Sequence, residues 1–135
     1  MREEILKQFF TGDADVNVLV RDLKGSLITK GDVTKHPIED MSEPFQVLPE
    51  HLIRLCDAVL AAEINPKYLQ AVGFCIITSD NFEYDTDTSE GDLVGETVSD
   101  WSAPMVHYPL TERNVEKFRH RLVTGEDRFT ISDAS

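Results

Sequence analysis

Residues 71–78 read Ala-Val-Gly-Phe-Cys-Ile-Ile-Thr, a nearly continuous apolar run with β-branched and aromatic residues. This pattern is typical of a strand buried on both faces of a sheet. Further along, aromatic and acidic residues alternate over 82–85, a polar stretch covers 86–92, and apolar residues return over 93–101. We therefore expect a central β-hairpin over residues 71–101, with a solvated acidic tip.

A second hairpin is predicted near the N-terminus. Valine alternates with other residues over 16–20, and Lys-Gly-Ser at 24–26 offers a turn before the apolar segment 27–29. Alternation with a period of two indicates a strand, and a short turn with glycine joins antiparallel strands. The two hairpins predict a small antiparallel sheet, and residues 31–46, which have no regular period, predict a connecting loop.

Helices are expected to cover this sheet. Gly12 and Gly125 are natural helix stops, and Thr111 is a good N-cap. The chain has the size of one domain, so we predict an α+β fold with a single domain over residues 1–135, whose residues 126–135 form a loosely held tail. Apolar residues at helical spacing place the helices near residues 2–10, 49–63 and 111–123.

Charge gives the main indication of function. The chain has 13 Lys and Arg against 25 Asp and Glu, a net charge of −12, which disfavours nucleic acid and anionic membranes as partners. No Lys or Arg lies between Lys67 and Arg113, whereas nine carboxylates do. Aromatic side chains among carboxylates suit a surface that binds a basic protein, because the aromatics anchor and the negative field speeds encounter by about 10- to 1000-fold.

We expect this surface to comprise Asp80, Glu83, Tyr84, Asp85, Asp87, Glu90, Asp92, Glu96, Asp100 and Trp101. Phe82 and Trp101 suit a place in the core equally well. The basic residues of the last helix, Arg113, Lys117, Arg119 and Arg121, are explained by solvation and by compensation of the helix dipole.

Catalytic and metal-binding signatures are weak. Asp85, Asp87, Ser89 and Glu96 fall at positions 1, 3, 5 and 12 of a calcium-binding loop, but Glu90 stands where that loop requires glycine. The four histidines lack zinc-site spacing, and no nucleophile elbow, phosphate loop or dinucleotide fingerprint occurs. We expect no catalytic residue, no metal and no cofactor.

The expected compartment is the cytoplasm. Cys56 and Cys75 lie in apolar runs far apart in the sequence, which favours buried thiols in a reducing environment over a disulfide. The N-terminus lacks the apolar stretch of a secretory signal, and no segment approaches the roughly 20 apolar residues that span a bilayer.

Three stretches within residues 52–126 carry a family resemblance: the helical Leu-Ile-Arg-Leu-Cys-Asp-Ala-Val-Leu at 52–60, Gly-Phe-Cys-Ile-Ile-Thr-Ser-Asp at 73–80, and Pro-Leu-Thr-Glu-Arg-Asn-Val at 109–115. In this region the chain resembles the small acidic immunity proteins of bacterial polymorphic and contact-dependent toxin systems. The resemblance implies stoichiometric neutralisation of a cognate toxin, often a basic nuclease. It transfers no individual functional residue.

The charge distribution and the resemblance together predict a non-catalytic binding protein, an immunity-type inhibitor that neutralises a basic toxin domain through its acidic surface. Two alternatives remain open. The same acids could serve a metal-dependent or carboxylate-based small enzyme, or the chain could be a structural or homo-oligomeric subunit.

Overall fold

The chain is mostly helical in the computed structural model, which describes residues 2–26, 28–30, 33–35, 41 and 43–134. Two short 3-10 helices, η1 (Pro66–Tyr68) and η2 (Ile131–Ala134), accompany the α-helices. The α-helices of the described residues are α1 (Glu3–Thr11), α2 (Val16–Ser26), α3 (Pro49–Leu60), α4 (Leu69–Thr78), α5 (Ser89–Ser102) and α6 (Glu112–Thr124).

Strands are very short. β1 (Ile28–Lys30) and β2 (Val33–Lys35) form a three-residue antiparallel pair, and β3 (Phe45–Gln46) runs parallel to β4 (Phe82–Glu83). The predicted α+β fold with an antiparallel sheet over residues 71–101 is therefore wrong, because most of the described residues are helical and residues 71–101 contain α4 and most of α5.

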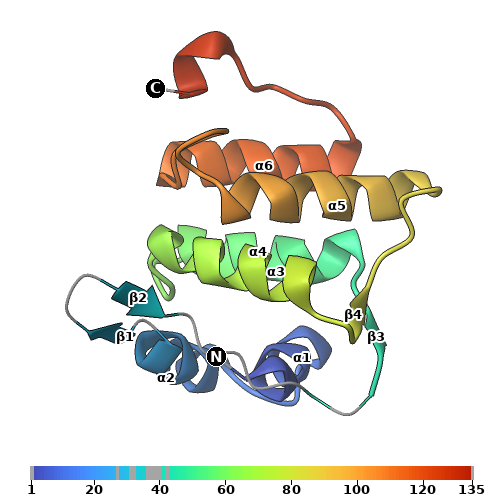
Figure 1. Ribbon diagram of the computed structural model, residues 1–135. Coiled ribbons are helices and arrows are strands. Elements are labelled where there is room, and N and C mark those ends of the chain that lie inside the picture. The colour runs from blue at the N-terminus through green and yellow to red at the C-terminus, as the bar shows by residue number, and fades with distance from the viewer. Residues whose placement is uncertain (1, 27, 31–32, 36–40, 42, 135) are drawn as a thin grey trace.

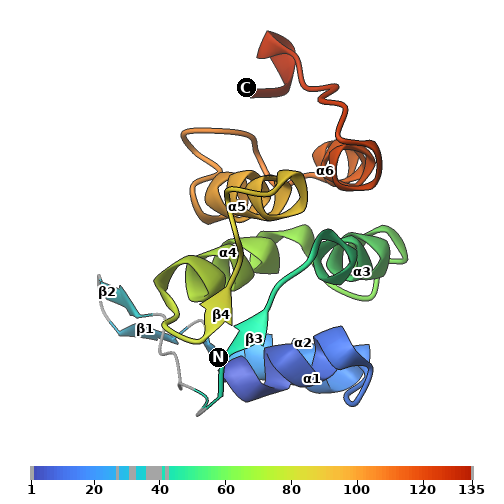
Figure 2. The same cartoon turned by 90° about the vertical axis from the view of Figure 1, so that its right-hand side faces the viewer.

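The helices stack in pairs, one layer on another. Figures 1 and 2 show α1 and α2 in the bottom layer, α3 and α4 in the middle, and α5 and α6 on top, while β3 and β4 lie together at one end of the stack. α4 packs on α5, and α3 packs on α6. None of the helices formed by the described residues combines the length and the apolar character needed to cross a membrane.

The predicted central strand over residues 71–78 is helix α4. This helix lies in the middle layer, so most of its circumference is buried, and only Phe74 and Ile77 among its large apolar side chains are exposed. A helix that is apolar on nearly all sides gives the same continuous run as a strand buried on both faces. The run therefore identified a buried element but not its type.

The predicted return strand over residues 93–101 is helix α5. Its buried apolar residues Val94, Val98 and Trp101 recur at positions i, i+4 and i+7, which is a helical period. The Thr88 side chain accepts a hydrogen bond from the Gly91 amide and caps the helix. The helical period and the N-cap both indicated a helix. The glycines and polar residues among these positions made the helical pattern hard to recognise.

The N-terminal hairpin is also wrong in its first strand. Residues 16–20 belong to α2, where Leu19 and Leu23 are fully buried at helical spacing. Strand β1 does lie near the predicted segment 27–29, but it pairs with β2, inside the segment 31–46 that was expected to be a loop. Leu27 and residues 31–32, 36–40 and 42 of these predictions lie outside the described residues.

The helices predicted near residues 2–10, 49–63 and 111–123 are confirmed as α1, α3 and α6. Gly12 and Gly125 end α1 and α6 with φ of 86° and 79°, in the left-handed region. The Thr111 hydroxyl accepts a hydrogen bond from the Asn114 amide at 3.2 Å, so it caps α6 as expected. Each of these ends is fixed by local chemistry.

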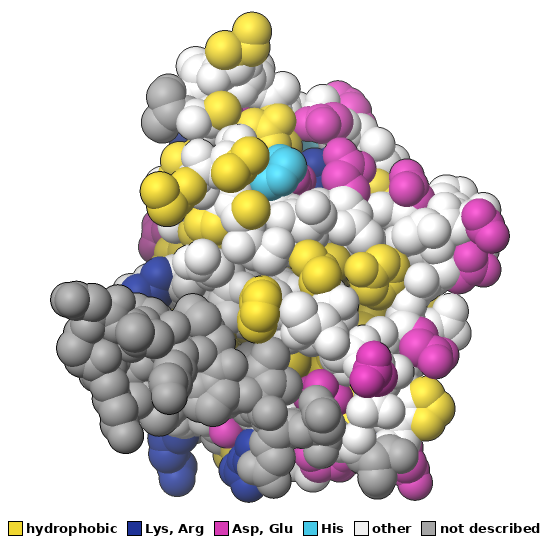
Figure 3. All heavy atoms as spheres, viewed as in Figure 1, with side chains coloured by type: hydrophobic (Ala, Val, Ile, Leu, Met, Phe, Trp, Pro, Cys, Tyr) yellow, Lys and Arg dark blue, Asp and Glu magenta, His cyan; other side chains and the backbone are white. Residues whose placement is uncertain are grey.

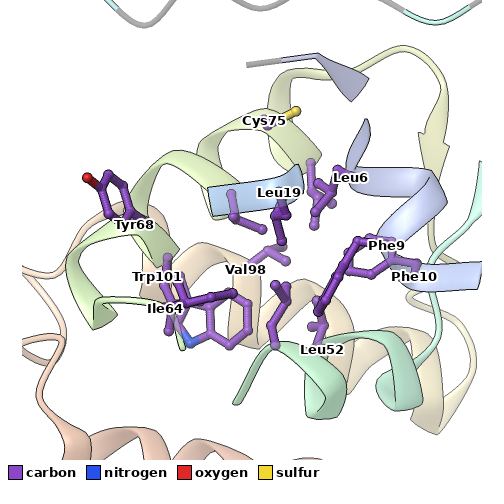
Figure 4. Packing of buried hydrophobic residues seen from close by; sticks show 14 of the residues in the cluster. Leu6, Phe9, Phe10, Leu19, Leu52, Ile64, Tyr68, Cys75, Val98 and Trp101 are labelled. Atoms are coloured by element: carbon purple, nitrogen blue, oxygen red, sulfur yellow. The ribbon is translucent and has the colours of Figure 1, made fainter. Parts of the chain in front are cut away.

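The apolar core is continuous through the layers. Figure 4 shows Leu6, Phe9 and Leu19 of the bottom layer gathered with Leu52 of α3, and Trp101 of α5 belongs to the same cluster. At the end of the stack, Glu3 is fully buried, and its Oε1 accepts hydrogen bonds from the Met41 amide and from Asn81 Nδ2. Glu3 thereby ties α1 to the segments that lead into β3 and β4.

Close contact between α4 and α5 depends on Gly73. A Cβ at this position would lie 2.7 Å from the Val98 carbonyl oxygen and 2.9 Å from the Trp101 Cβ. These atoms belong to a packed helix, so they have little freedom to move away. The middle and top layers can approach this closely only because position 73 has no side chain.

We expect Gly73→Ala to lower the free energy of unfolding by about 1–3 kcal/mol, the usual cost of overpacking a core. Gly95→Ala, in α5, is the matched control, because its Cβ would meet side-chain atoms only, Tyr84 Cε2 at 3.1 Å and Thr86 Cγ2 at 3.4 Å, and alanine favours helix by up to about 1 kcal/mol. Urea unfolding of both variants is the measurement. Equal stabilities would show that α4 and α5 are not in close contact at Gly73.

Candidate functional site

The acidic segment runs from the end of α4 through β4 to α5. Asp80, Glu83, Asp85, Asp87, Glu90 and Asp92 are exposed, and none of them forms an ion pair with a described Lys, Arg or His. We call these six residues the acidic end. The space-filling view shows acidic side chains along the edge where β4 and the start of α5 lie, and no Lys or Arg appears along that edge (Figure 3).

Hydrogen bonds within the chain account for the shape of the loop before α5. Asp85 Oδ1 accepts from the Asp87 amide at 2.9 Å, and the Asp85 carbonyl accepts from the Thr88 hydroxyl at 2.8 Å. A Cβ at Gly91 would lie 1.7 Å from that carbonyl oxygen, so the loop requires glycine there. The loop is therefore built to begin α5, and it holds the carboxylates of Asp85 and Asp87 in water.

The calcium-loop arrangement is not present. Ser89 and Glu96 lie in α5 and are seven positions apart, which corresponds to about 10 Å along the helix axis. A calcium-binding loop instead needs a sharp turn at its sixth position, and the residue there, Glu90, lies inside the helix. The described residues contain no group of three or more His, Cys, Asp or Glu side chains placed to hold a metal.

A cleft adjoins the acidic end. It has a volume of about 420 Å³ and is formed by the N-terminal ends of α3 and α5 and the C-terminal end of α6. Leu93, Leu122 and Val123 contribute apolar surface, while Glu50 and Glu90 provide carboxylates. A long cationic side chain suits such a cleft, because its methylene stem can cover apolar atoms while its charge meets a carboxylate.

A second cleft, of about 320 Å³, is formed by the ends of the paired strands β3 and β4 and by the loop after β4. Gln46, Glu83, Tyr84 and Asp85 line it. Tyr84 is half-buried, so only part of its side chain is accessible there. The predicted residues Glu83, Tyr84 and Asp85 are thus brought together.

The structure separates Glu96 and Asp100 from the acidic end. Arg121 of α6 donates from Nη2 to Asp100 Oδ2 at 2.9 Å and from Nη1 to Glu96 Oε1 at 3.2 Å. Nη2 also donates to the Thr97 hydroxyl, and His107 Nδ1 lies 3.2 Å from the other Asp100 oxygen. The Arg121 and Asp100 side chains are only 2% and 8% exposed, so this ion pair is internal.

Trp101 also lies away from any binding surface. It is fully buried, and its ring packs edge-to-face against Phe118 of α6 with centroids 6.1 Å apart. Of the ten predicted surface residues, Trp101 and Asp100 are therefore structural, because both hold α5 against α6. The alternative that Trp101 belongs to the core is the correct one.

Sequence reasoning missed the role of Arg121. Solvation and dipole compensation were expected to explain it, yet it is buried in the interface between α5 and α6. Its position was a usable signal, since it follows Phe118 by three residues and directly precedes Leu122, both of which are on the apolar stripe of α6. A cation within an apolar stripe needs a buried anion.

The segment after Gly125, expected to be a loose tail, returns to α6. Asp133 is buried, and its carboxylate pairs with Lys117 and Arg113. The Phe129 ring stacks on Tyr108 with centroids 4.0 Å apart. The basic residues of α6 thus bind carboxylates within the chain.

The Cys56 thiol is not suited to nucleophilic chemistry. Cys56 and Cys75 are both buried, and burial, together with the adjacent Asp57, raises the pKa of the Cys56 thiol to about 12. A thiol with this pKa is almost entirely protonated at neutral pH, so it is a poor nucleophile.

None of the protein-family models, curated proteins or solved structures compared with this chain matches it. Function must therefore be inferred from the geometry of the chain itself.

Substituting Arg121 tests whether Asp100 is a buried, paired carboxylate rather than part of the acidic end. We expect Arg121→Met to lower the free energy of unfolding by about 3–5 kcal/mol, because it leaves the buried Asp100 without its main cation. Arg119→Met is the matched control in the same helix, since the Arg119–Asp57 pair is exposed and should contribute about 1 kcal/mol or less. Denaturant unfolding measures both, and an equal, small loss in both variants would contradict an internal Arg121.

Asp133 makes attachment of the C-terminal segment sensitive to acid. Hydrogen bonds from Lys117 and from the Thr130 amide lower its pKa from 3.8 to about 2. A depressed pKa means that the stabilisation is complete above the ordinary value and is lost as pH falls through about 2. Carbon-detected NMR titration of the Asp133 carboxyl should give this low midpoint.

Two variants test the cause of that shift. Lys117→Met should return the Asp133 midpoint toward its ordinary value, whereas Lys7→Met, which removes a cation paired with Glu43, should leave it unchanged. An Asp133 carboxyl that titrates near 3.8 in the unmodified chain would show that the segment is not held as described.

Proposed function

We propose that this chain is a non-catalytic, cytoplasmic binding protein, an immunity-type inhibitor that neutralises a basic toxin domain through its acidic end. The observation that carries the proposal is the combination of six exposed carboxylates without described cationic partners and a neighbouring cleft with apolar and acidic walls. Local cations neutralise the carboxylates elsewhere on α5, but not these.

The acidic end suits recognition of a basic partner for two physical reasons. Carboxylates on one end create a local negative field that steers a cationic protein toward it. The apolar surface of Leu93 and Val123 then gives the contact a desolvated centre, which a purely charged surface lacks. Field and cleft together favour a partner that inserts Lys or Arg side chains.

A basic nuclease is a suitable partner because its phosphate-binding surface is cationic. Carboxylates placed over that surface would occupy the positions where phosphates bind. In this proposal, inhibition follows from blocking substrate access, and it needs no catalytic residue on the inhibitor.

Replacing four carboxylates tests the proposal. Asp85→Asn, Asp87→Asn, Glu90→Gln and Asp92→Asn together remove charge and keep shape, and Asn at position 85 can still accept the Asp87 amide hydrogen bond. The control variant carries Glu4→Gln, Glu63→Gln, Glu112→Gln and Glu116→Gln, an equal loss of exposed charge at other places.

Each tagged variant is used to capture partners from the source cell, and the captured protein is purified for stopped-flow association. We expect the partner to be a basic protein. It should associate with the acidic-end variant about 10-fold or more slowly than with the unmodified chain, and the rate should depend less on salt. The control variant should retain most of the rate. Equal rates for the two variants would exclude the acidic end as the binding surface.

A further inference from the structure

The segment after α6 is held on the outside of the helix stack. Figures 1 and 2 show residues 126–134 rising from the end of α6 and turning back above it, apart from the lower layers. It begins at Gly125, whose φ of 79° reverses the chain. Two side chains, Phe129 and Asp133, provide its main contacts with the rest of the chain.

Phe129 enters an aromatic site. Its ring stacks on Tyr108 at 4.0 Å and meets the Phe118 ring at 4.7 Å, centroid to centroid. The Arg121 guanidinium carbon lies 5.6 Å from the Phe129 ring centroid, so the buried cation also faces this ring. Stacking on aromatics beside a cation is a specific arrangement for an aromatic side chain.

Asp133 enters a cationic site formed by Arg113 and Lys117, which precede Phe118 on α6. Its side chain is 1% exposed, with one oxygen paired to Lys117 Nζ and the other 3.3 Å from Arg113 Nη2. Asn114 Nδ2 donates to the Asp133 backbone carbonyl at 3.2 Å. Three neighbouring side chains of α6 thus recognise both the carboxylate and the backbone of this residue.

The burial pattern of the segment is that of a recognised ligand. Ile131, its most apolar aliphatic residue, is 95% exposed, whereas the charged Asp133 is 5% exposed. Packing for stability would bury the isoleucine and leave the carboxylate in water. Here attachment depends instead on a ring and a carboxylate that meet matching side chains.

We propose that Tyr108, Phe118, Arg113, Asn114 and Lys117 form a peptide-binding site, which residues 126–134 occupy as a tethered ligand. The site takes from a partner protein a segment in which an aromatic residue is followed four positions later by a carboxylate. The tether supplies the chain's own segment at an effective concentration of about millimolar, so only a better-matched or abundant segment displaces it. This site is separate from the acidic end and does not depend on the proposed inhibitor function.

The test empties the site by substitution, without truncating the chain. The double variant Phe129→Ala with Asp133→Asn removes the ring and the carboxylate that hold residues 126–134 (the tail) on α6. Circular dichroism and amide exchange of α3, α4 and α5 establish that the fold persists, while faster exchange over residues 127–134 establishes that the tail is released.

A fluorescein-labelled synthetic peptide with the sequence of residues 126–134 is the probe, followed by fluorescence anisotropy. We expect it to bind the double variant and to bind the unmodified chain at least 10-fold more weakly, because the tethered tail competes. A peptide carrying the same two substitutions should not bind. Adding Lys117→Met to the double variant should weaken binding at least 5-fold, whereas Arg119→Met should not.

Two results would overturn the proposal. If the tail of the double variant stays as protected as in the unmodified chain, Phe129 and Asp133 are not what holds it. If the tail is released, the fold persists and the peptide still does not bind, α6 offers no peptide-binding site.

Discussion

The division of the acidic segment and the attachment of the C-terminal segment both depend on the interaction between Arg121 of α6 and Asp100 of α5. A buried guanidinium needs a buried anion, and its hydrogen bonds to Asp100, Glu96 and Thr97 fix α5 against α6. This pairing divides the acidic segment into carboxylates with an internal role and carboxylates left in water. The same guanidinium lies over the Phe118 ring and faces Phe129, so it also supports the site that holds the C-terminal segment.

The sequence predicted those parts of the fold that local chemistry determines. α1, α3 and α6 have apolar stripes on otherwise polar helices; Gly12, Thr111 and Gly125 mark ends of α1 and α6, and Pro49 begins α3. α4 was mistaken for a strand because its position between two layers requires apolar residues on nearly every side. α2 was mistaken because its valines alternate, although Leu19 and Leu23 carried the helical period.

The sequence predicted the exposed carboxylates that lie close together along the chain. It did not predict the carboxylates that form ion pairs with residues far away in the sequence. The absence of cations near residues 80–92 could be read directly, and these carboxylates are exposed. The partner of Asp100 lies 21 positions later, in a different helix, so composition could not reveal it. The attachment of Asp133 to α6 was unpredictable for a similar reason, since a tail rich in polar residues gives no sign that one carboxylate will be buried.

Carboxyl footprinting with a carbodiimide and glycine ethyl ester, read residue by residue by tandem mass spectrometry, tests this division of charges most directly. We predict fast labelling of Asp80, Glu83, Asp85, Asp87, Glu90 and Asp92, slower labelling of Glu96, and strong protection of Asp100 in the native chain, with all differences lost after denaturation. Labelling of Asp100 as fast as that of Asp87 in the native chain would contradict the account, because Asp100 would then be part of the exposed acidic surface and Arg121 would lack its buried partner.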